Sequence, residues 1–287
     1  MSSIYEYPVK RLVFSSFGFY GRHRGALPGV WFIRCFGEFG ITAPTVWQTL
    51  YRMERAGEVE ARRAARDKLY WPTTIAWASL DAGAAKLAPC AEREPWDGTW
   101  TIVLLRSSGA RPAPLDRARS LLRTEGFVAL QPGVFVHPRR RVARIVEAAE
   151  RTELAGNVTV FRAALEFPEV GRLVKHAWSL DRLRRQYEAF IQRYQRAPAA
   201  RTPKAAFLHR LYVTLDYLDV AWADPELPPQ LLTDAWPGHK ARALVAKLNG
   251  RFTAAATLFA DSLLDDILRT HPPLANAASE HLKEVNV

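Results

Sequence analysis

The sequence predicts an α+β multidomain protein: an N-terminal winged helix-turn-helix, a middle ferredoxin-like βαββαβ domain and a C-terminal all-helical domain. Three observations predict this order. An amphipathic helix runs into a basic hairpin over 41–72, strand and helix patterns alternate over 96–166, and helical periodicity fills most of the remainder. With 287 residues and 48% apolar content, the chain can bury two or three cores. We expect domains over 1–90, 96–168 and 169–287.

The first pattern predicts a recognition helix with two different faces. Apolar residues at i, i+4 and i+7 form a buried stripe: Val46, Leu50 and Met53. Thr42 can cap this helix, Pro44 can begin it and Gly57 can end it. The opposite side carries groups that bond or flank base edges and phosphates: Thr42, Thr45, Trp47, Gln48, Thr49, Tyr51 and Arg52.

A basic hairpin follows that helix. Two short alternating segments, 59–61 and 69–71, flank a turn with four cations and one anion. The cations are Arg62, Arg63, Arg66 and Lys68. Taken singly, the helix and the charged turn are typical of any amphipathic helix and any solvated hairpin. In tandem they favour a wing against phosphates, and therefore binding to double-stranded DNA.

The segments around this module have supporting roles. Residues 30–39 are aromatic-rich and predict a buried scaffold helix, with the weaker apolar segment 9–19 packed beneath it. Residues 82–95 are rich in small residues and proline, which indicates a connector between domains. Cys35 and Cys90 are too few for a disulfide framework, so we expect two buried free thiols.

From Trp96 the pattern becomes strand, helix, strand, strand, helix, strand. The segments are 99–106, 115–125, 127–130, 133–137, 139–154 and 157–166. The two helical stripes are expected to cover one face of the sheet. After Pro168 the chain is predicted to be helical, with a stripe over 183–194, further helices at 204–222, 238–250 and 252–270, and a frayed end over 272–287.

Charge and hydropathy limit the classes of partner. The net charge is +11, yet residues 197–287 carry nine Lys or Arg against ten Asp or Glu. A polyanion is therefore expected to meet the first two-thirds of the chain. No apolar run is long enough for a membrane span and no signal core is evident, so we expect a cytoplasmic protein that does not bind membranes.

Several segments together resemble the PaaX family, repressors of phenylacetic-acid degradation operons. The resemblance lies in Trp96-Asp97-Gly98-Thr99-Trp100, Glu125-Gly126-Phe127, Trp178-Ser179-Leu180, Tyr187-Glu188-Ala189-Phe190 and the block from Asp224 to Arg242. It extends from about Arg11 to about Phe252. It implies a homodimeric repressor that binds an operator through a winged helix and is released by an aryl-coenzyme-A thioester. Trp47 and Gln48 stand where the family commonly has Arg then Thr. Regulation of a different aromatic or acyl-coenzyme-A pathway is therefore an alternative.

An effector site is expected between the middle and C-terminal domains. Its cations would meet coenzyme A phosphates and its aromatic groups an acyl chain: Arg139, Arg140, Arg141, Arg144, Trp178, Trp236, His239 and Arg242. Arginines at the start of a helix oppose its dipole, which indicates a compensating anion. A solvated cluster and core tryptophans are the alternatives.

The competing class is a nuclease built on the ferredoxin-like domain. Such enzymes hold metal with an Asp at the end of the first strand, where this chain has Leu104-Leu105-Arg106-Ser107. Asp97 lies ahead of that strand, where with Gly98 it favours a turn. The seven histidines show no metal spacing, and no phosphate-binding glycine loop or nucleophile elbow occurs. We therefore expect no catalytic residue, no metal and no cofactor.

Overall fold

The computed structural model describes residues 7–64, 66–88, 96–106, 112–139, 142, 145–146, 157–164, 170–197, 199–232 and 235–285. The chain forms two compact units. The first unit comprises Met1–Pro89, Phe190–Ala221 and Ala241–Val287, and the second comprises Cys90–Ala189 and Trp222–Lys240. These units do not coincide with the three consecutive segments expected from the sequence, since parts of the last third pack with the first ninety residues. The three-domain division stays a prediction.

The first unit begins with short helical segments around a small strand. They are α1 (Val9–Ser16), the π-helical turn η2 (Phe17–Gly21), α2 (Arg22–Arg24), β1 (Leu27–Pro28) and α3 (Gly29–Gly37). Phe17 of η2 packs edge-on against Phe32 of α3, with ring centroids 5.2 Å apart. The buried scaffold helix and the packing of the apolar segment 9–19 against it are therefore confirmed. Cys35 on α3 is free and buried, and burial raises the pKa of its thiol, while Cys90 lies outside the described residues.

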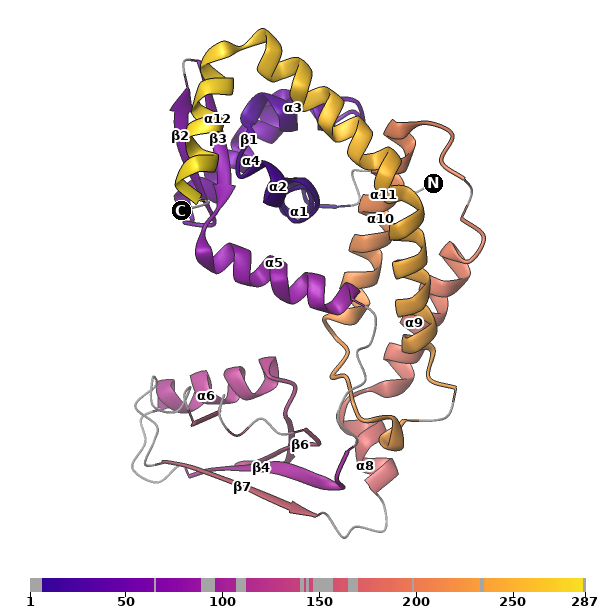
Figure 1. The fold of residues 1–287 in the computed structure, drawn as a ribbon. Coiled ribbons are helices and arrows are strands. Elements are labelled where there is room, and N and C mark those ends of the chain that lie inside the picture. Colours follow the sequence, from indigo (N-terminus) through magenta and orange to yellow (C-terminus); the bar gives the residue numbers. More distant parts are fainter. Residues whose placement is uncertain are drawn as a thin grey trace. The chain divides into compact units, whose positions relative to one another are not determined.

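A helix and an antiparallel hairpin come next. They are α4 (Ala43–Arg55), β2 (Val59–Ala64) and β3 (Asp67–Pro72). The sheet has the order β1-β3-β2 (Figure 1). Gly57 ends α4 with a φ of 67°, a conformation that favours glycine. The predicted side-chain cap was wrong, because the Thr42 hydroxyl meets the Thr45 hydroxyl at 2.8 Å and bonds no backbone N–H of the helix.

Residues that were expected to belong to a connector are helical. Helix α5 extends over Thr74–Leu87, and the Thr73 hydroxyl accepts the Ala76 N–H at 3.4 Å at its start. The segment is rich in alanine, the strongest helix former, which outweighs the single Gly83. The connector therefore begins no earlier than Ala88, and residues 89–95 lie outside the described part of the chain.

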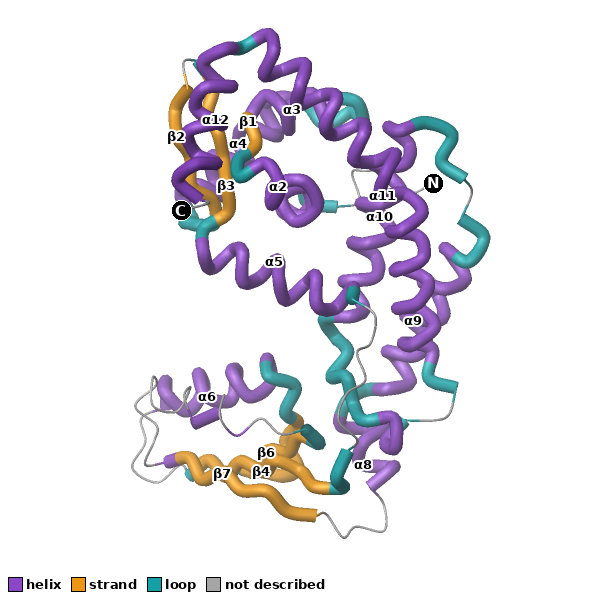
Figure 2. The backbone as a smooth tube through the Cα atoms, in the orientation of Figure 1, coloured by secondary structure: helices purple, strands orange, loops and turns teal. Residues whose placement is uncertain are grey.

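Long helices from the last third of the chain complete the first unit, which is mostly helical (Figure 2). They are α9 (Leu180–Tyr194), α10 (Pro203–Ala221), α11 (Pro237–Thr270) and α12 (Pro272–Val285), of which α9 and α11 begin in the second unit. Helix α11 is continuous where two helices were expected, because Gly250 lowers helix propensity without ending the helix. The end expected to be frayed is α12, whose Leu274 and His281 are buried.

Aromatic packing explains why these helices belong with the N-terminal segments. The Phe207 ring of α10 stacks on Tyr20 at 5.3 Å and on Phe39 at 6.0 Å, and Phe259 of α11 lies 5.2 Å from it. The indole N–H of Trp31 also donates to the Ala260 carbonyl at 3.0 Å. The two ends of the chain therefore share one core.

Ion pairs follow the same junction within the first unit. N-terminal arginines meet aspartates of α10 and α11 at N–O distances of 2.5 to 3.6 Å: Arg11–Asp219, Arg24–Asp261, Arg24–Asp265 and Arg34–Asp266. Asp261 and Asp265 both lie beside Arg24, and the Asp265 side chain is 64% exposed. The acidic side chains of the last third therefore face arginines of the first third.

The second unit contains a four-stranded antiparallel sheet. Its elements are β4 (Thr99–Leu105), α6 (Pro112–Thr124), β5 (Val128–Gln131), β6 (Val134–His137) and β7 (Val158–Ala164). The strand order is β5-β6-β4-β7. This order and the position of α6 are consistent with the predicted ferredoxin-like domain. Most of the second predicted helix, 139–154, lies outside the described residues.

Both faces of this sheet are covered. Alternate residues of β4 belong to two different cores, since successive strand side chains point to opposite faces. Val103 and Leu105 pack with Leu115, Leu122 and Ile145, as expected for helices on one face. The other face, which sequence analysis left open, packs against α8 (Val170–Ala177) and the segment around the short helix η4 (Pro229–Leu231).

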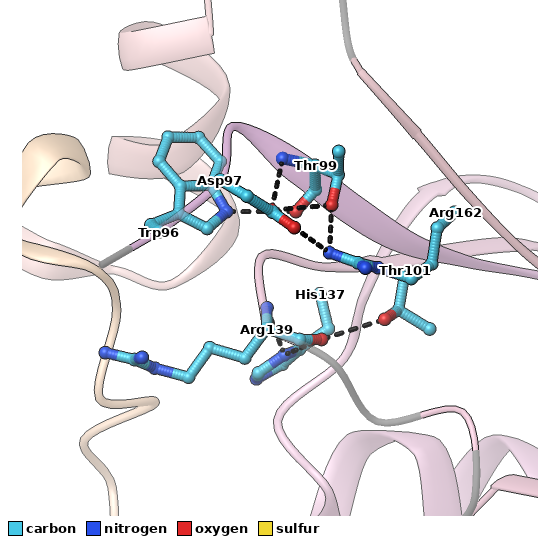
Figure 3. A network of polar contacts seen from close by, with 7 residues as sticks. All are labelled: Trp96, Asp97, Thr99, Thr101, His137, Arg139 and Arg162. Carbon is cyan, nitrogen blue, oxygen red and sulfur yellow. Dashed lines mark hydrogen bonds and ion pairs between the residues drawn. The ribbon is translucent and has the colours of Figure 1, made fainter. Parts of the chain in front are cut away.

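A polar network fixes the start of β4 (Figure 3). Asp97 Oδ1 accepts the Thr99 N–H at 3.0 Å and the Thr99 hydroxyl at 2.7 Å, while Arg162 of β7 donates to Asp97 Oδ2 at 2.5 Å. These hydrogen bonds, that of the Thr99 hydroxyl foremost, lower the pKa of Asp97. With Gly98 at φ 78°, Asp97 forms the turn that the sequence predicts.

Candidate nucleic-acid interface

Helix α4 has one buried and one exposed side. The predicted stripe is confirmed, since Val46 and Leu50 are 0% exposed and Met53 is 1% exposed. The other side faces solvent and bears polar or cationic residues: Thr42, Thr45, Gln48, Arg52 and Arg55. The helix therefore presents a polar row on a rigidly packed support.

Arg55 is a member of this row that sequence analysis missed. It lies three residues after Arg52 and seven after Gln48, so all three share one helix face. The same helical spacing, continued for one more turn, was enough to find it. The side chains of Gln48, Arg52 and Arg55 make no hydrogen bond or ion pair with other residues that the structure describes, which leaves their donors available to an external anion.

The threonines of α4 are partly used within the helix. Thr49 is half-buried and its hydroxyl donates to the Thr45 carbonyl at 2.8 Å, while the hydroxyls of Thr42 and Thr45 pair with each other. Thr49 therefore offers little to a ligand. Thr42 and Thr45 lie at the exposed start of α4, where the N–H groups of the first turn favour an anion.

Two aromatic side chains flank the polar row. Tyr51 is 55% exposed and Trp47 is 37% exposed. The Trp47 ring lies over Gly29, where an added Cβ would be 2.6 Å from the ring and 2.9 Å from Asp67 Oδ1. Asp67 Oδ2 in turn accepts the Val30 N–H at the start of α3, at 3.0 Å. Gly29 thus allows α3, α4 and the hairpin to meet closely.

The four predicted wing cations have different surroundings. Arg62 forms an ion pair with Glu284 of α12 at 2.6 Å, and the Lys68 amine lies 2.8 Å from both carboxylate oxygens of Glu54. Arg63 and Arg66 are exposed, the latter at the turn. The turn is therefore less strongly cationic toward an external ligand than its composition indicates.

The hairpin is also covered by a helix that sequence analysis did not connect to it. Helix α12 lies beside β2 and β3 (Figure 1). The His281 ring is 4.1 Å from the Trp71 ring, measured between centroids. No sequence pattern joins residues 71 and 281, because the contact arises from tertiary packing alone.

Two of the predicted effector residues of the second unit, Trp178 and Trp236, take part in its internal packing. Trp178 donates its indole N–H to the Gly126 carbonyl at 2.9 Å and stacks on Trp100. Trp236 is buried against Tyr187, with centroids 6.1 Å apart. His239 is exposed.

Arg139 is half-buried and its Nε donates to the Glu226 carbonyl at 2.9 Å, while its own carbonyl accepts the Thr101 hydroxyl (Figure 3). Arg140, Arg141 and Arg144 lie outside the described residues. Arg242 belongs to the first unit, where its Nε donates to the Tyr217 hydroxyl at 3.1 Å. The effector site stays a prediction.

The residues that the structure describes contain no helix that is long and apolar enough to cross a membrane. They also contain no group of three or more His, Cys, Asp or Glu side chains arranged to hold a metal ion.

Comparison with known families matches two consecutive parts of the chain. Residues 93–174 match the PaaX protein central Cas2-like domain, and residues 178–262 match the PaaX-like protein C-terminal domain. Neither match reaches α4 or the hairpin, so the interface above rests on its own geometry.

Comparison with individual proteins agrees. The chain is 29% identical over 221 residues to the transcriptional repressor PaaX of Escherichia coli, covering 73% of this chain and 69% of that protein. An uncharacterized protein from Mycobacterium tuberculosis has a similar fold, with a TM-score of 0.60 and 22% identity over 88% of this chain and 98% of the other. The two domain matches and the similarity to the repressor show that the chain belongs to the PaaX family.

Proposed function

We propose that this protein is a DNA-binding transcriptional regulator that acts as a repressor. The observation that carries the proposal is the exposed polar face of α4, which ends in Arg52 and Arg55 and lies opposite a fully buried stripe. A helix supported in this way can enter a major groove without losing its packing. The similarity to a transcriptional repressor supports the same conclusion.

The residues of this interface have different tasks. Gln48 carries both a donor and an acceptor, which suits bidentate pairing with adenine. Arg52 and Arg55 can pair with guanine or with phosphates, and Arg63 and Arg66 of the hairpin contact the backbone. α3, α4 and the hairpin then work as a winged helix-turn-helix, with the hairpin as its wing.

The protein acts as a homodimer on an operator with inverted half-sites, because one helix in one groove provides too little contact for strong specificity. Its effector is an aryl- or acyl-coenzyme-A thioester of a catabolic pathway, phenylacetate catabolism or a related one. This part of the proposal rests on the family resemblance.

The nuclease alternative finds no support in the middle sheet. Asp97, which lies just ahead of the first strand, is occupied by Thr99 and Arg162 in a turn. A metal-dependent reaction needs a carboxylate available to the ion.

Binding isotherms test the proposal. The protein is titrated with duplexes from its own promoter region and with random duplexes, at several salt concentrations. We expect log K to fall linearly with log salt, by about 0.9 for each phosphate neutralised, and binding to the promoter duplex to be tighter. Binding that is equally weak on both duplexes and independent of salt would contradict a DNA-binding regulator.

A variant pair sharpens this experiment. Gln48→Ala should relax preference at one or two base pairs, each worth about 1–3 kcal/mol, and leave the salt slope unchanged. Arg119→Ala removes an exposed cation of α6, paired with Asp116, and serves as the control.

A separate titration tests the effector. Phenylacetyl-coenzyme A and other thioesters are added to the complex of the wild-type protein with the promoter duplex. If none of them releases the protein from DNA at millimolar concentration, the effector is removed from the proposal.

A further inference from the structure

We infer that helix α12 restrains the hairpin, because Glu284 holds the Arg62 guanidinium in the place of a DNA phosphate. The contact then lowers the affinity of the protein for DNA, and undocking of α12 raises it. This inference rests on the proposed function, since it concerns the regulation of the same interface.

The strand register shows which side of the hairpin α12 covers. Arg62 lies opposite Leu69, and Glu60 lies opposite Trp71. Paired residues of antiparallel strands share a face, and so do residues two apart. These four side chains therefore form one face, which we call the outer face. Lys68 lies on the other face of the hairpin and contacts Glu54 of α4, so that face is turned toward α4.

Close packing holds α12 on the outer face. His281 is 4% exposed and its ring lies against Trp71. Leu282 approaches Gly25 so closely that an added Cβ would be 2.9 Å from its Cδ2, and Gly25 has a φ of 69°. The helix is thus seated by apolar contacts, and its charged side chains come to a defined position.

The electrostatic part of the contact is weak enough to be exchanged. Arg62 and Glu284 side chains are 37% and 56% exposed, and exposed ion pairs contribute little to stability. The hydrogen bond from Arg62 lowers the pKa of Glu284, so this side chain is a carboxylate at neutral pH. A phosphate oxygen is chemically equivalent to it as a partner for the guanidinium.

Other carboxylates surround the same guanidinium. Glu280 of α12 acts electrostatically on Arg62, and Glu60 lies on the outer face beside Trp71. A duplex that approaches this side of the hairpin must displace Glu284 and overcome the electrostatic repulsion of Glu280 and Glu60. A purely supporting α12 makes the opposite prediction, because loosening it would disorder the wing and weaken binding.

Glu284→Gln separates the two possibilities, since it removes the charge and keeps the shape. We expect two- to fivefold tighter DNA binding at low salt, roughly the strength of one exposed ion pair, and a salt slope steeper by about 0.9. Asp219→Asn is the matched control, because it also removes one negative charge from the first unit. Asp219 lies on α10 and pairs with Arg11 of α1. Equal or weaker binding by the Glu284→Gln protein would overturn the inference.

The Arg62→Ala background provides the second test. If Glu284 acts by holding Arg62, Glu284→Gln has no effect in this background, whereas a general change of surface charge tightens binding in both. Persistence of the full effect without Arg62 overturns the inference. Absence of DNA binding by the wild-type protein would overturn the proposed function as well, while unchanged affinity of the Glu284→Gln variant in a protein that binds DNA overturns this inference alone.

Discussion

The exposed face of α4 and the cations of the hairpin were both predicted to contact DNA, and their surroundings in the structure differ. Gln48, Arg52 and Arg55 on α4 face solvent without partners among the described residues. On the hairpin, Arg62 and Lys68 are already paired with Glu284 and Glu54. The comparison teaches that a cationic composition predicts a binding surface only after internal ion pairs have been assigned.

The largest expected effect comes from a substitution in the buried apolar stripe of α4. Leu50 is 0% exposed, so Leu50→Ala should lower the free energy of unfolding by about 2–5 kcal/mol, measured by urea denaturation. The control is Gln48→Ala on the opposite face, which should change stability by less than about 0.5 kcal/mol. Similar losses in both variants would show that α4 lacks the two-sided character described here.

The next effect compares the two surfaces directly. Removing both exposed cations of α4, Arg52→Ala with Arg55→Ala, should weaken DNA binding on the order of tenfold or more. Removing both paired cations of the hairpin, Arg62→Ala with Lys68→Ala, should cost clearly less, because each already has a carboxylate partner. Both proteins lose two positive charges, so equal losses in a binding isotherm would remove the distinction between the surfaces.

A smaller effect concerns the contact that joins the two surfaces. Gly29→Ala places a methyl group against the Trp47 ring and Asp67, and should reduce stability by about 1 kcal/mol. DNA affinity should fall with it, because the hairpin loses its fixed distance from α4. Gly37→Ala on the same helix, where an added Cβ meets nothing within 4 Å, is the control. A melting temperature for Gly29→Ala equal to that of the control would contradict the close approach.

The smallest effect is a pH dependence of the α12 contact. Burial, and then the nearby Arg62, lower the pKa of His281 below its ordinary value of 6.5, while Glu284 and Glu60 oppose this shift. As the pH falls below about 6.5, the undocked state binds a proton before the docked state does. Docking is therefore at full strength above that pH and weakens below it.

Hydrogen exchange measures this dependence. Amides of α12 should exchange faster at pH 5.5 than at pH 7.5, after correction for the intrinsic rates, and His281→Phe should remove the difference. Helix α5, which carries no histidine, supplies the internal reference. Equal acceleration in α5 and α12 would indicate general loosening of the fold.

Local patterns predicted the elements that rest on short-range physics. The stripe of α4, the scaffold helix α3, the strands of the middle sheet and the turn at Asp97 follow from spacing, from side-chain burial and from turn chemistry. Errors arose where local signals were ambiguous. Gly250 was taken as a helix end although α11 continues through it, and the alanine-rich C-terminal end of α5, residues 82–87, was taken as part of a connector.

The site was predicted in part for the same reason. Gln48 and Arg52 face solvent as the spacing predicts, and the same spacing rule also covers Arg55, while contact of these residues with DNA stays a prediction. Among the effector residues, Trp178 and Trp236 are engaged in packing, and a tryptophan in a sequence carries no mark that distinguishes a core position from a ligand pocket.

The sequence by itself determined the family, the order of α6 and the strands in the middle sheet, and the polar face of α4, because these depend on residues close together in the chain. The tertiary structure alone decided that α10, α11 and α12 share a core with the first ninety residues, and that Glu284 meets Arg62 across 222 positions. Such contacts depend on which surfaces bury one another in three dimensions. The order of residues along the chain does not show which distant segments will pack against one another.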